Sequence, residues 1–313
     1  MKALVLGARG AVGVAVVAAL RADGHEVATA GRRGDVDVVL DVQAADASAR
    51  LAQAARGHDV VINASGVESR ALAGLSALVD VSASAAYLRE LRAASPGGAR
   101  AVGGAGLAPG LSTLLVAALE TRPGDDVDVA VSLGAGEAHG PAAVAWTAGL
   151  VGREVVSAPA GERAVNLRER RRLPGRAGRH ATFLRADFPD HDLIGVERGV
   201  AVRSYLAVDV PWLTWAMRAA AYVPGGGRVV AAAPHLGGTT WSVSATHRRT
   251  GQALGVQGSG QSAATGVLAA LAATRLVESG VPGMGSMASV AGWEDAVAAL
   301  RRHDASVEHW QRR

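Results

Sequence analysis

The first part of the chain alternates short, mainly apolar segments with longer segments whose apolar residues recur at helical spacing. Short apolar runs are typical of strands that helices cover on both faces of a parallel sheet. The pattern predicts strands at 2–6, 26–30, 36–40, 59–62, 78–81 and 99–102, with helices at 11–21, 46–56, 111–119 and through 87–91. This alternation predicts an α/β fold: a doubly wound parallel sheet of the Rossmann type with right-handed crossovers.

The rhythm changes after residue 122, where Arg-Pro-Gly-Asp-Asp is typical of a linker. Beyond it the segments predict strands at 127–133 and 200–208, helices at 141–151 and 212–222, and a hairpin of 241–247 with 252–257. This mixture indicates a second, α+β domain. Helices at 261–278 and 293–302 are expected to return to the first domain, so the predicted division is 1–122, 123–258 and 259–313.

The turn after the first strand carries three glycines at the spacing Gly-x-x-Gly-x-x-Gly. Gly7 permits the tight turn, Gly10 lets backbone amides approach a pyrophosphate, and Gly13 lets the helix pack close to the strand. Phosphate is attracted to the helix N-terminus. The loop therefore predicts a dinucleotide site in 1–122 made by Gly7, Arg9, Gly10, Ala11, Val12 and Gly13, which leaves 123–258 as the substrate or dimerisation domain.

The end of the second predicted strand indicates which dinucleotide binds. An acidic residue there holds the ribose 2′-hydroxyl of NAD, but this chain has Arg32 and Arg33. Guanidinium groups bind a phosphate through charge-assisted, partly bidentate hydrogen bonds, and Arg9 projects from the glycine loop nearby. The arginines favour NADP(H) over NAD(H).

Composition narrows the class of protein. Among 313 residues, 49% are hydrophobic, yet no apolar run is long enough to span a membrane and no secretory signal is visible. With Cys 0, disulfides and cysteine nucleophiles are excluded, and we expect a cytoplasmic protein. The pI of about 10.2 reflects arginine, as in GC-rich bacterial genomes, and we expect no nucleic-acid or membrane partner. Lys2 is the only lysine, which excludes a Walker A lysine, a Schiff base and a Tyr-x-x-x-Lys pair.

Further polar residues follow the predicted strands. Because the carboxyl ends of parallel strands meet at one edge, the residues expected to line the cofactor site there are Asp41, Asn63, Ala64, Ser65, Gly66, Asp80 and Ser82. The turn at 63–66 is expected to meet the nicotinamide half. For Asp80 and Ser82, capping of the strand is the alternative.

Four segments together resemble the saccharopine dehydrogenase-like oxidoreductases. They are the glycine loop, Asn-Ala-Ser-Gly at 63–66, Leu-Val-Asp-Val-Ser at 78–82 and Gly-Leu-Ala-Pro-Gly-Leu at 106–111. Leu78 stands where the family has tyrosine, and Ala83-Ser84 where it often has Gly-Glu. The resemblance implies hydride transfer between a nicotinamide and a C=N, C=O or C=C bond of a small molecule. We also expect a homodimer.

Two residues are candidate proton donors. His139 lies on a glycine-rich segment before the helix at 141–151, and imidazole titrates near neutral pH. Tyr205 is the second candidate, although a strand tyrosine more often belongs to a core. The histidines lack metal-ligand spacing, so no metal site is predicted. A non-catalytic NADP(H) sensor, which needs no proton donor, is the alternative function.

Two other segments invite functional interpretations. Seven arginines crowd residues 163–179, for which a solvated mobile loop is the expectation. The stretch with Trp212, Trp215, Met217 and Tyr222 could cover an apolar substrate or a dimer partner, although burial in the core is the default for such residues.

Overall fold

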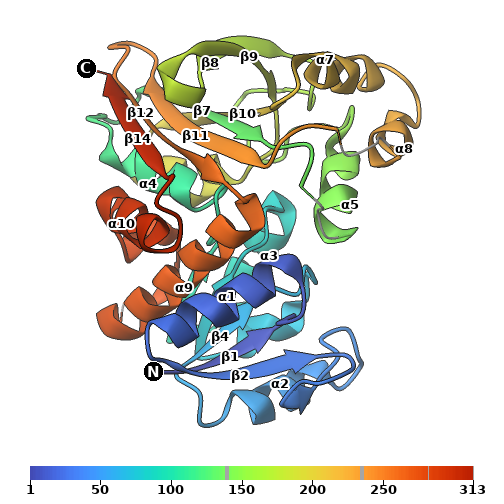
Figure 1. Cartoon of the computed structure of the whole chain (residues 1–313), viewed down its shortest axis with the longest axis vertical. Helices are drawn as coiled ribbons and strands as arrows, with labels where there is room; N and C mark the ends of the chain where they lie inside the picture. The colour runs from blue at the N-terminus through green and yellow to red at the C-terminus, as the bar shows by residue number, and fades with distance from the viewer. Residues whose placement is uncertain (138–140, 233–235, 281, 313) are drawn as a thin grey trace. The chain divides into compact units, whose positions relative to one another are not determined.

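A computed structural model describes residues 1–137, 141–232, 236–280 and 282–312, which form two units (Figure 1). Unit 1 contains Met1–Gly110 and Ser262–His303, and unit 2 contains Leu111–Gln261 and Asp304–Arg313. This division differs from the one expected at residue 122. Helix α4 (Leu111–Ala118) packs against strands of unit 2, and β14 (Glu308–Arg312) extends the sheet of that unit.

The sheet of unit 1 has the order β13-β6-β5-β4-β1-β2-β3, and all its neighbours pair in parallel. Its strands are β1 (Lys2–Leu6), β2 (Glu26–Gly31), β3 (Val38–Val39), β4 (Val60–Asn63), β5 (Ala77–Asp80), β6 (Arg100–Gly103) and β13 (Gly283–Gly285). The predicted doubly wound parallel sheet is confirmed. The strand order reverses between β1 and β4, and ligands of such sheets bind beside the carboxyl ends of the strands at this point.

Helices cover both faces of this sheet. They are α1 (Ala11–Ala22), α2 (Ala47–Ala55), α3 (Ala85–Ala94), α9 (Gln261–Ser279) and α10 (Trp293–His303), with short 3₁₀ turns at Arg70–Gly74 and Met287–Ser289. In Figure 1, α9 and α1 lie side by side. Gly266 makes this approach possible, because a Cβ there would lie 2.5 Å from the Cβ of Ala15. No described helix is long and apolar enough to cross a bilayer.

Unit 2 contains a mixed sheet with the order β14-β12-β11-β7-β10-β9-β8. Among the strands that the structure describes in this unit, only β7 and β10 pair in parallel. Its other strands are β7 (Asp126–Leu133), β8 (Arg170–Pro174), β9 (His180–Arg185), β10 (Ala201–Val208), β11 (Thr240–His247) and β12 (Ala253–Ser259). Its other helices are α5 (Pro141–Leu150), α6 (Val196–Arg198), α7 (Pro211–Ala220) and α8 (Gly226–Ala231), with a π-helical turn at His191–Gly195 and a 3₁₀ turn at Arg176–Gly178.

The charge run at 163–179 suggested a mobile loop, but part of this segment is a strand. Residues Arg170–Pro174 form the edge strand β8, which pairs with β9. Arg170 and Arg172 are exposed, whereas Leu173 is buried. The charge run concealed this strand because the long side chain of Arg171 is partly exposed while its guanidinium pairs with the buried carboxylate of Asp128.

Asp128 of β7 receives that arginine. The carboxylate is 1% exposed, accepts hydrogen bonds from Nε and Nη2 of Arg248 at 2.9 and 2.6 Å, and forms an ion pair with Nε of Arg171 at 2.8 Å. Arg248 also donates to the hydroxyl of Tyr205 at 3.2 Å. A buried charge of this kind is tolerated because it is paired on both sides. Asp128 therefore joins β7 to the edge strand β8 and to the β11–β12 turn.

Asp128→Asn should destabilise the protein by about 2–4 kcal/mol, because it leaves two guanidinium groups facing a neutral amide in a buried site. The partial exposure of Arg171 and Arg248 keeps the loss below that of a fully buried pair. Urea unfolding followed by tryptophan fluorescence measures it. Glu26→Gln, which breaks the exposed Lys2–Glu26 pair, is the matched control and should move the midpoint little. Equal unfolding midpoints for the two variants would contradict the role of Asp128 in joining β7 to β8 and to the β11–β12 turn.

Candidate functional site

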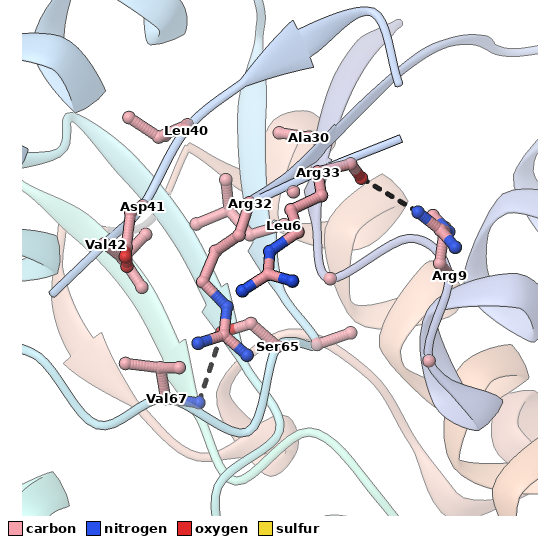
Figure 2. A pocket seen from close by; sticks show the side chains of 14 residues that line it. Leu6, Arg9, Ala30, Arg32, Arg33, Leu40, Asp41, Val42, Ser65 and Val67 are labelled. Carbon is pink, nitrogen blue, oxygen red and sulfur yellow. Dashed lines mark hydrogen bonds between the residues drawn. The ribbon is translucent and has the colours of Figure 1, made fainter. Parts of the chain in front are cut away.

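A cavity of about 550 Å³ lies at the carboxyl ends of β1 to β4 in unit 1 (Figure 2). Its lining comes from the ends of β1 and β2 and from the segments that follow β1, β2, β3 and β4. The lining residues are Leu6, Gly7, Arg9, Gly10, Ala30, Gly31, Arg32, Arg33, Leu40, Asp41, Val42, Ala64, Ser65 and Val67. The cavity therefore brings together the glycine loop, the two arginines after β2 and the turn after β4.

Close backbone packing explains the glycines. Gly7 has a φ of +74°, and a Cβ there would lie 2.3 Å from the Cα of Ser65. A Cβ on Gly13 would lie 2.1 Å from the carbonyl oxygen of Gly7. Gly10 is less crowded, since its nearest neighbour would be the Gly7 carbonyl oxygen at 3.3 Å. Gly7 and Gly13 thus serve the packing of the turn, whereas Gly10 faces the cavity.

The glycine turn places the N-terminus of α1 beside the cavity. The amide of Gly10 donates to the carbonyl of Gly7 at 2.9 Å and closes the turn, and α1 begins at Ala11. The first amides of a helix have no carbonyl partner within the helix and carry its positive dipole end. Ala11 and Val12 belong to this first turn, and Gly13 is buried in it. Anions are stabilised at such a position.

Three arginines from two loops line the cavity next to the helix end. Arg32 and Arg33 follow β2, are exposed, and point into the cavity in Figure 2. Arg9 is turned toward the β2–β3 connection, where its Nη1 donates to the carbonyl oxygen of Arg33 at 2.9 Å. Gly34 makes room for it, because a Cβ there would lie 2.0 Å from that nitrogen. Arg9 therefore fastens the glycine loop to the loop that carries the two cavity arginines.

The remaining lining is mostly apolar. Leu40 and Val42 are buried and flank Asp41 after β3, and Val67 lies on the turn after β4. Asp41 is the one acidic residue of the lining, and its Oδ1 accepts from the amide of Gln43 at 3.0 Å. With three arginines against one aspartate, the described lining favours a negatively charged ligand with a flat apolar part.

The turn after β4 is fixed by hydrogen bonds from the core. Asn63 donates from Nδ2 to Asp80 at 2.8 Å and to the carbonyl of Val67 at 3.1 Å, so its Oδ1 is the acceptor for the Ser65 hydroxyl at 2.6 Å. Ser65 Oγ in turn accepts from the amide of Val67 at 3.2 Å. This chain of contacts sets the conformation of the two cavity residues Ser65 and Val67.

Asp80 and Ser82 do not line the cavity. Asp80 is 0% exposed, and besides Asn63 it accepts from the amide of Ser82 at 2.8 Å and the hydroxyl of Tyr87 at 2.9 Å. Burial raises the pKa of the Asp80 carboxyl, although these donors oppose the rise. Asp80 is thus a positioning residue, and capping of the strand is the role that its contacts with Ser82 describe. Asn63 is buried in the same way, and Gly66 is an exposed turn residue with a φ of +69°.

Tyr205, one of the two candidate proton donors, is not part of this cavity. Tyr205 is 3% exposed in a cluster with Ala130, Leu173 and Phe183, and its hydroxyl accepts from Arg248. Burial raises the pKa of this tyrosine. Its position is that of a core residue of unit 2, which argues against direct contact with a substrate. His139 lies outside the described residues.

Sequence reasoning missed the apolar part of the site and the support behind it. Leu40, Val42 and Val67 line the cavity, and Tyr87 holds the carboxylate of Asp80. Leu40, Val42 and Val67 could have been found from their position in the sequence, because they follow directly on a predicted strand or on the turn after it. Tyr87 lies on α3, and nothing in its spacing indicated a contact with the end of β5.

No protein-family model and no curated protein sequence matches the chain. Among solved structures, the WlbA (WbpB) dehydrogenase from Thermus thermophilus in complex with NAD and UDP-GlcNAcA is 16% identical, covers 96% of this chain and 92% of its own, and has a TM-score of 0.38. The protein lin1944 from Listeria innocua is 34% identical over 20% of this chain and 31% of its own, with a TM-score of 0.19.

The 3-alpha-hydroxysteroid dehydrogenase from Pseudomonas sp. B-0831, complexed with NADH, is 18% identical over 36% of this chain and 53% of its own, with a TM-score of 0.21. The chain thus spans less than two thirds of the Listeria and Pseudomonas proteins. Similarities of this size identify neither a reaction nor a substrate. The resemblance to saccharopine dehydrogenase-like oxidoreductases stays a prediction.

Asn63→Asp should destabilise the protein in a pH-dependent way. The substitution keeps the shape but sets a second buried carboxyl against Asp80, so the folded pKa of the pair rises above the value of 3.8 for a free aspartate. The folded state then holds more protons than the unfolded state, and stability falls as pH rises. We expect a loss of roughly 2–4 kcal/mol at pH 7.5 and a smaller loss near pH 5, measured by urea unfolding.

The double variant Asn63→Asp/Asp80→Asn is the matched control, because it keeps one carboxyl and one amide in the pair. It should recover part of the stability at pH 7.5 and lose most of the added pH dependence. A single variant as stable as the wild type at pH 7.5 would show that the Asn63–Asp80 contact does not hold the turn.

Proposed function

We propose that unit 1 binds NADP(H) and that the protein is an NADP(H)-dependent oxidoreductase acting on a small molecule. One observation carries the choice of cofactor: Arg32 and Arg33 enter the cavity at the end of β2, where an acidic residue would hold the ribose of NAD. Two guanidinium groups favour a 2′-phosphate through charge-assisted hydrogen bonds.

Each part of the cofactor has a counterpart in the cavity. The pyrophosphate would lie on the first turn of α1 next to Gly10, where free helix amides face the ligand. The adenine would pack on the apolar side chains of Val42 and Val67. Arg9 holds the two loops together through the carbonyl of Arg33 rather than supplying the main phosphate contact.

The bound nicotinamide would supply the hydride chemistry, and the chain's own residues bind and orient the cofactor. The turn of Asn63 to Gly66 follows β4 next to the point where the strand order reverses, and its Ser65 lines the cavity. We propose that this turn directs the nicotinamide half away from the adenosine side. A C=N bond as the reacting group, with C=O or C=C as alternatives, rests on the saccharopine dehydrogenase-like resemblance.

The buried position of Tyr205 supports a second candidate function, a non-catalytic NADP(H) sensor. Its side chain is buried and its hydroxyl accepts a hydrogen bond from Arg248. Tyr205 is therefore poorly placed to give a proton to a substrate. A screen of imines and carbonyl compounds that follows NADPH absorbance separates the two functions. Oxidation of NADPH by any of them supports the oxidoreductase, and tight binding without turnover supports the sensor.

NADPH should bind at least tenfold more tightly than NADH, because loss of the 2′-phosphate contacts costs about 1.5–3 kcal/mol. Arg32→Ala and Arg33→Ala should each weaken NADPH binding while changing the affinity for NADH little, as measured by calorimetric titration. Arg56→Ala removes an exposed arginine at the end of α2, away from the lining, and is the control. Equal affinities of the wild type for both cofactors would overturn the choice of NADP(H).

Gly10→Val should abolish cofactor binding and leave the fold largely intact. Its backbone conformation suits any residue, with φ of −75°, and the added Cβ has no neighbour closer than 3.3 Å. The two methyl groups would occupy the space next to the helix amides. Circular dichroism checks folding and NADPH fluorescence checks binding. A folded variant that binds NADPH as the wild type does would place the pyrophosphate elsewhere.

A further inference from the structure

Unit 2 contains a second cavity of about 550 Å³, which the proposed cofactor does not use. It lies at one end of the unit 2 sheet, and its lining includes residues of both faces, such as Phe183 on the inner face and Arg172 on the other. By the inner face we mean the face that carries Asp128, Ala130 and Ser132 of β7. Strands β8 to β11 and the start of α7 contribute to its walls. Its size is within the range of small-molecule sites in proteins.

Strand register explains why the face is hollow there. Ala207 of β10 lies opposite Ser132 of β7, and Ser132 lies opposite Ser242 of β11. Three small side chains thus stand in one row across the middle of the sheet. Nearer the other end of these strands, Tyr205 and the Asp128 network fill the same face, so the hollow ends at Tyr205 and its neighbour Phe183.

The rim of this cavity is positively charged. Arg172, Arg176 and His180 line it and are exposed, and neither arginine forms an ion pair among residues 1–137, 141–232, 236–280 and 282–312. Asp209 is the only acidic residue among the described residues of the lining, and its carboxylate accepts from the amides of Ala135 at 2.9 Å and Gly238 at 2.6 Å. The two arginines are therefore available to an anion, while the one carboxylate is engaged by the backbone.

The walls between this rim and the floor are largely apolar. Phe183 is 1% exposed and forms part of the floor, whereas Trp215 of α7 is 42% exposed. The indole of Trp215 lies 5.3 Å from the guanidinium of Arg170 and 5.9 Å from that of Arg218. Cation–π contacts of this kind hold the ring in place while one part of it remains open. An aromatic side chain fixed at a cavity is suited to stacking with a flat ligand.

One polar group of the lining lacks a partner. Ser242 is 2% exposed, and its Oγ is buried with no hydrogen-bond partner in the described part of the chain. An unsatisfied buried hydroxyl is unfavourable, so such groups in native proteins call for a reason. The Oγ of Ser242 thus marks one polar point of the cavity wall, and an acceptor carried on the flat body of a ligand would give it the missing bond after a small side-chain rotation.

We propose that this cavity binds a small organic anion: a carboxylate attached to a flat, apolar body such as an aromatic ring. The carboxylate is held by Arg172 and Arg176 at the rim, and the apolar body lies between Trp215 and Phe183. The inference does not depend on the proposed cofactor, because every residue that carries it belongs to unit 2.

Calorimetric titration with 1-naphthoate tests the proposal, with neutral 1-naphthalenemethanol as the matched probe. We expect saturable binding of the acid at one site per chain and at least tenfold weaker binding of the alcohol. The double variant Arg172→Gln/Arg176→Gln should weaken 1-naphthoate binding at least tenfold. Arg163→Gln, which removes an exposed arginine outside the lining, should leave it unchanged.

Ala181→Trp provides a second test, because Ala181 is an exposed lining residue of β9 and an indole there would fill the entrance without disturbing the core. This variant should lose 1-naphthoate binding and keep the urea unfolding midpoint of the wild type. Absence of saturable binding to the wild type would overturn the proposal, as would equal binding by the wild type, the double arginine variant and Ala181→Trp. Arg32→Ala should bind 1-naphthoate normally, which separates this result from any failure of the cofactor assignment.

Discussion

The candidate cofactor site depends on the close approach of three backbone segments at Gly7. The glycine turn packs against the β4 turn on one side and the first turn of α1 on the other, with space for no Cβ at Gly7 or Gly13. Because these contacts are between backbones, side-chain changes elsewhere do not relax them. They set the helix end, the β4 turn and the ends of β1 and β2 around one cavity, and the arginines after β2 give that cavity its charge.

Much of unit 1 follows from local patterns in the sequence. A parallel sheet needs apolar strands and amphipathic helices in alternation, and both are visible over short windows. The same locality explains the errors. Asp80 follows a strand as a site residue would, but its partner Tyr87 turns the carboxylate into the core. Helix α4 continues the alternation of unit 1, yet it packs on the sheet of unit 2, a choice that depends on tertiary contacts.

Unit 2 was less predictable because its order is set by pairs far apart in the sequence. Asp128 forms ion pairs with Arg171 and Arg248, which are distant from it in the sequence. When these pairs are not known, an arginine-rich stretch is interpreted as a solvated loop rather than as an edge strand. The second cavity has the same origin. Ala207, Ser132 and Ser242 are unremarkable separately, and only the register of β10, β7 and β11 places them in one row. Trp215, expected by default in the core, is instead partly exposed at the cavity.

The hydrogen bond from Arg9 to the carbonyl of Arg33 has a consequence for ligand association. The glycine loop and the β2–β3 connection are tied together before any ligand arrives, so the two ends of the cavity already have a fixed separation. The entropy lost in ordering these loops then belongs to folding instead of to binding. The bond thus shifts part of the ordering cost of these two loops from ligand binding to folding, by an amount that is small for one exposed hydrogen bond.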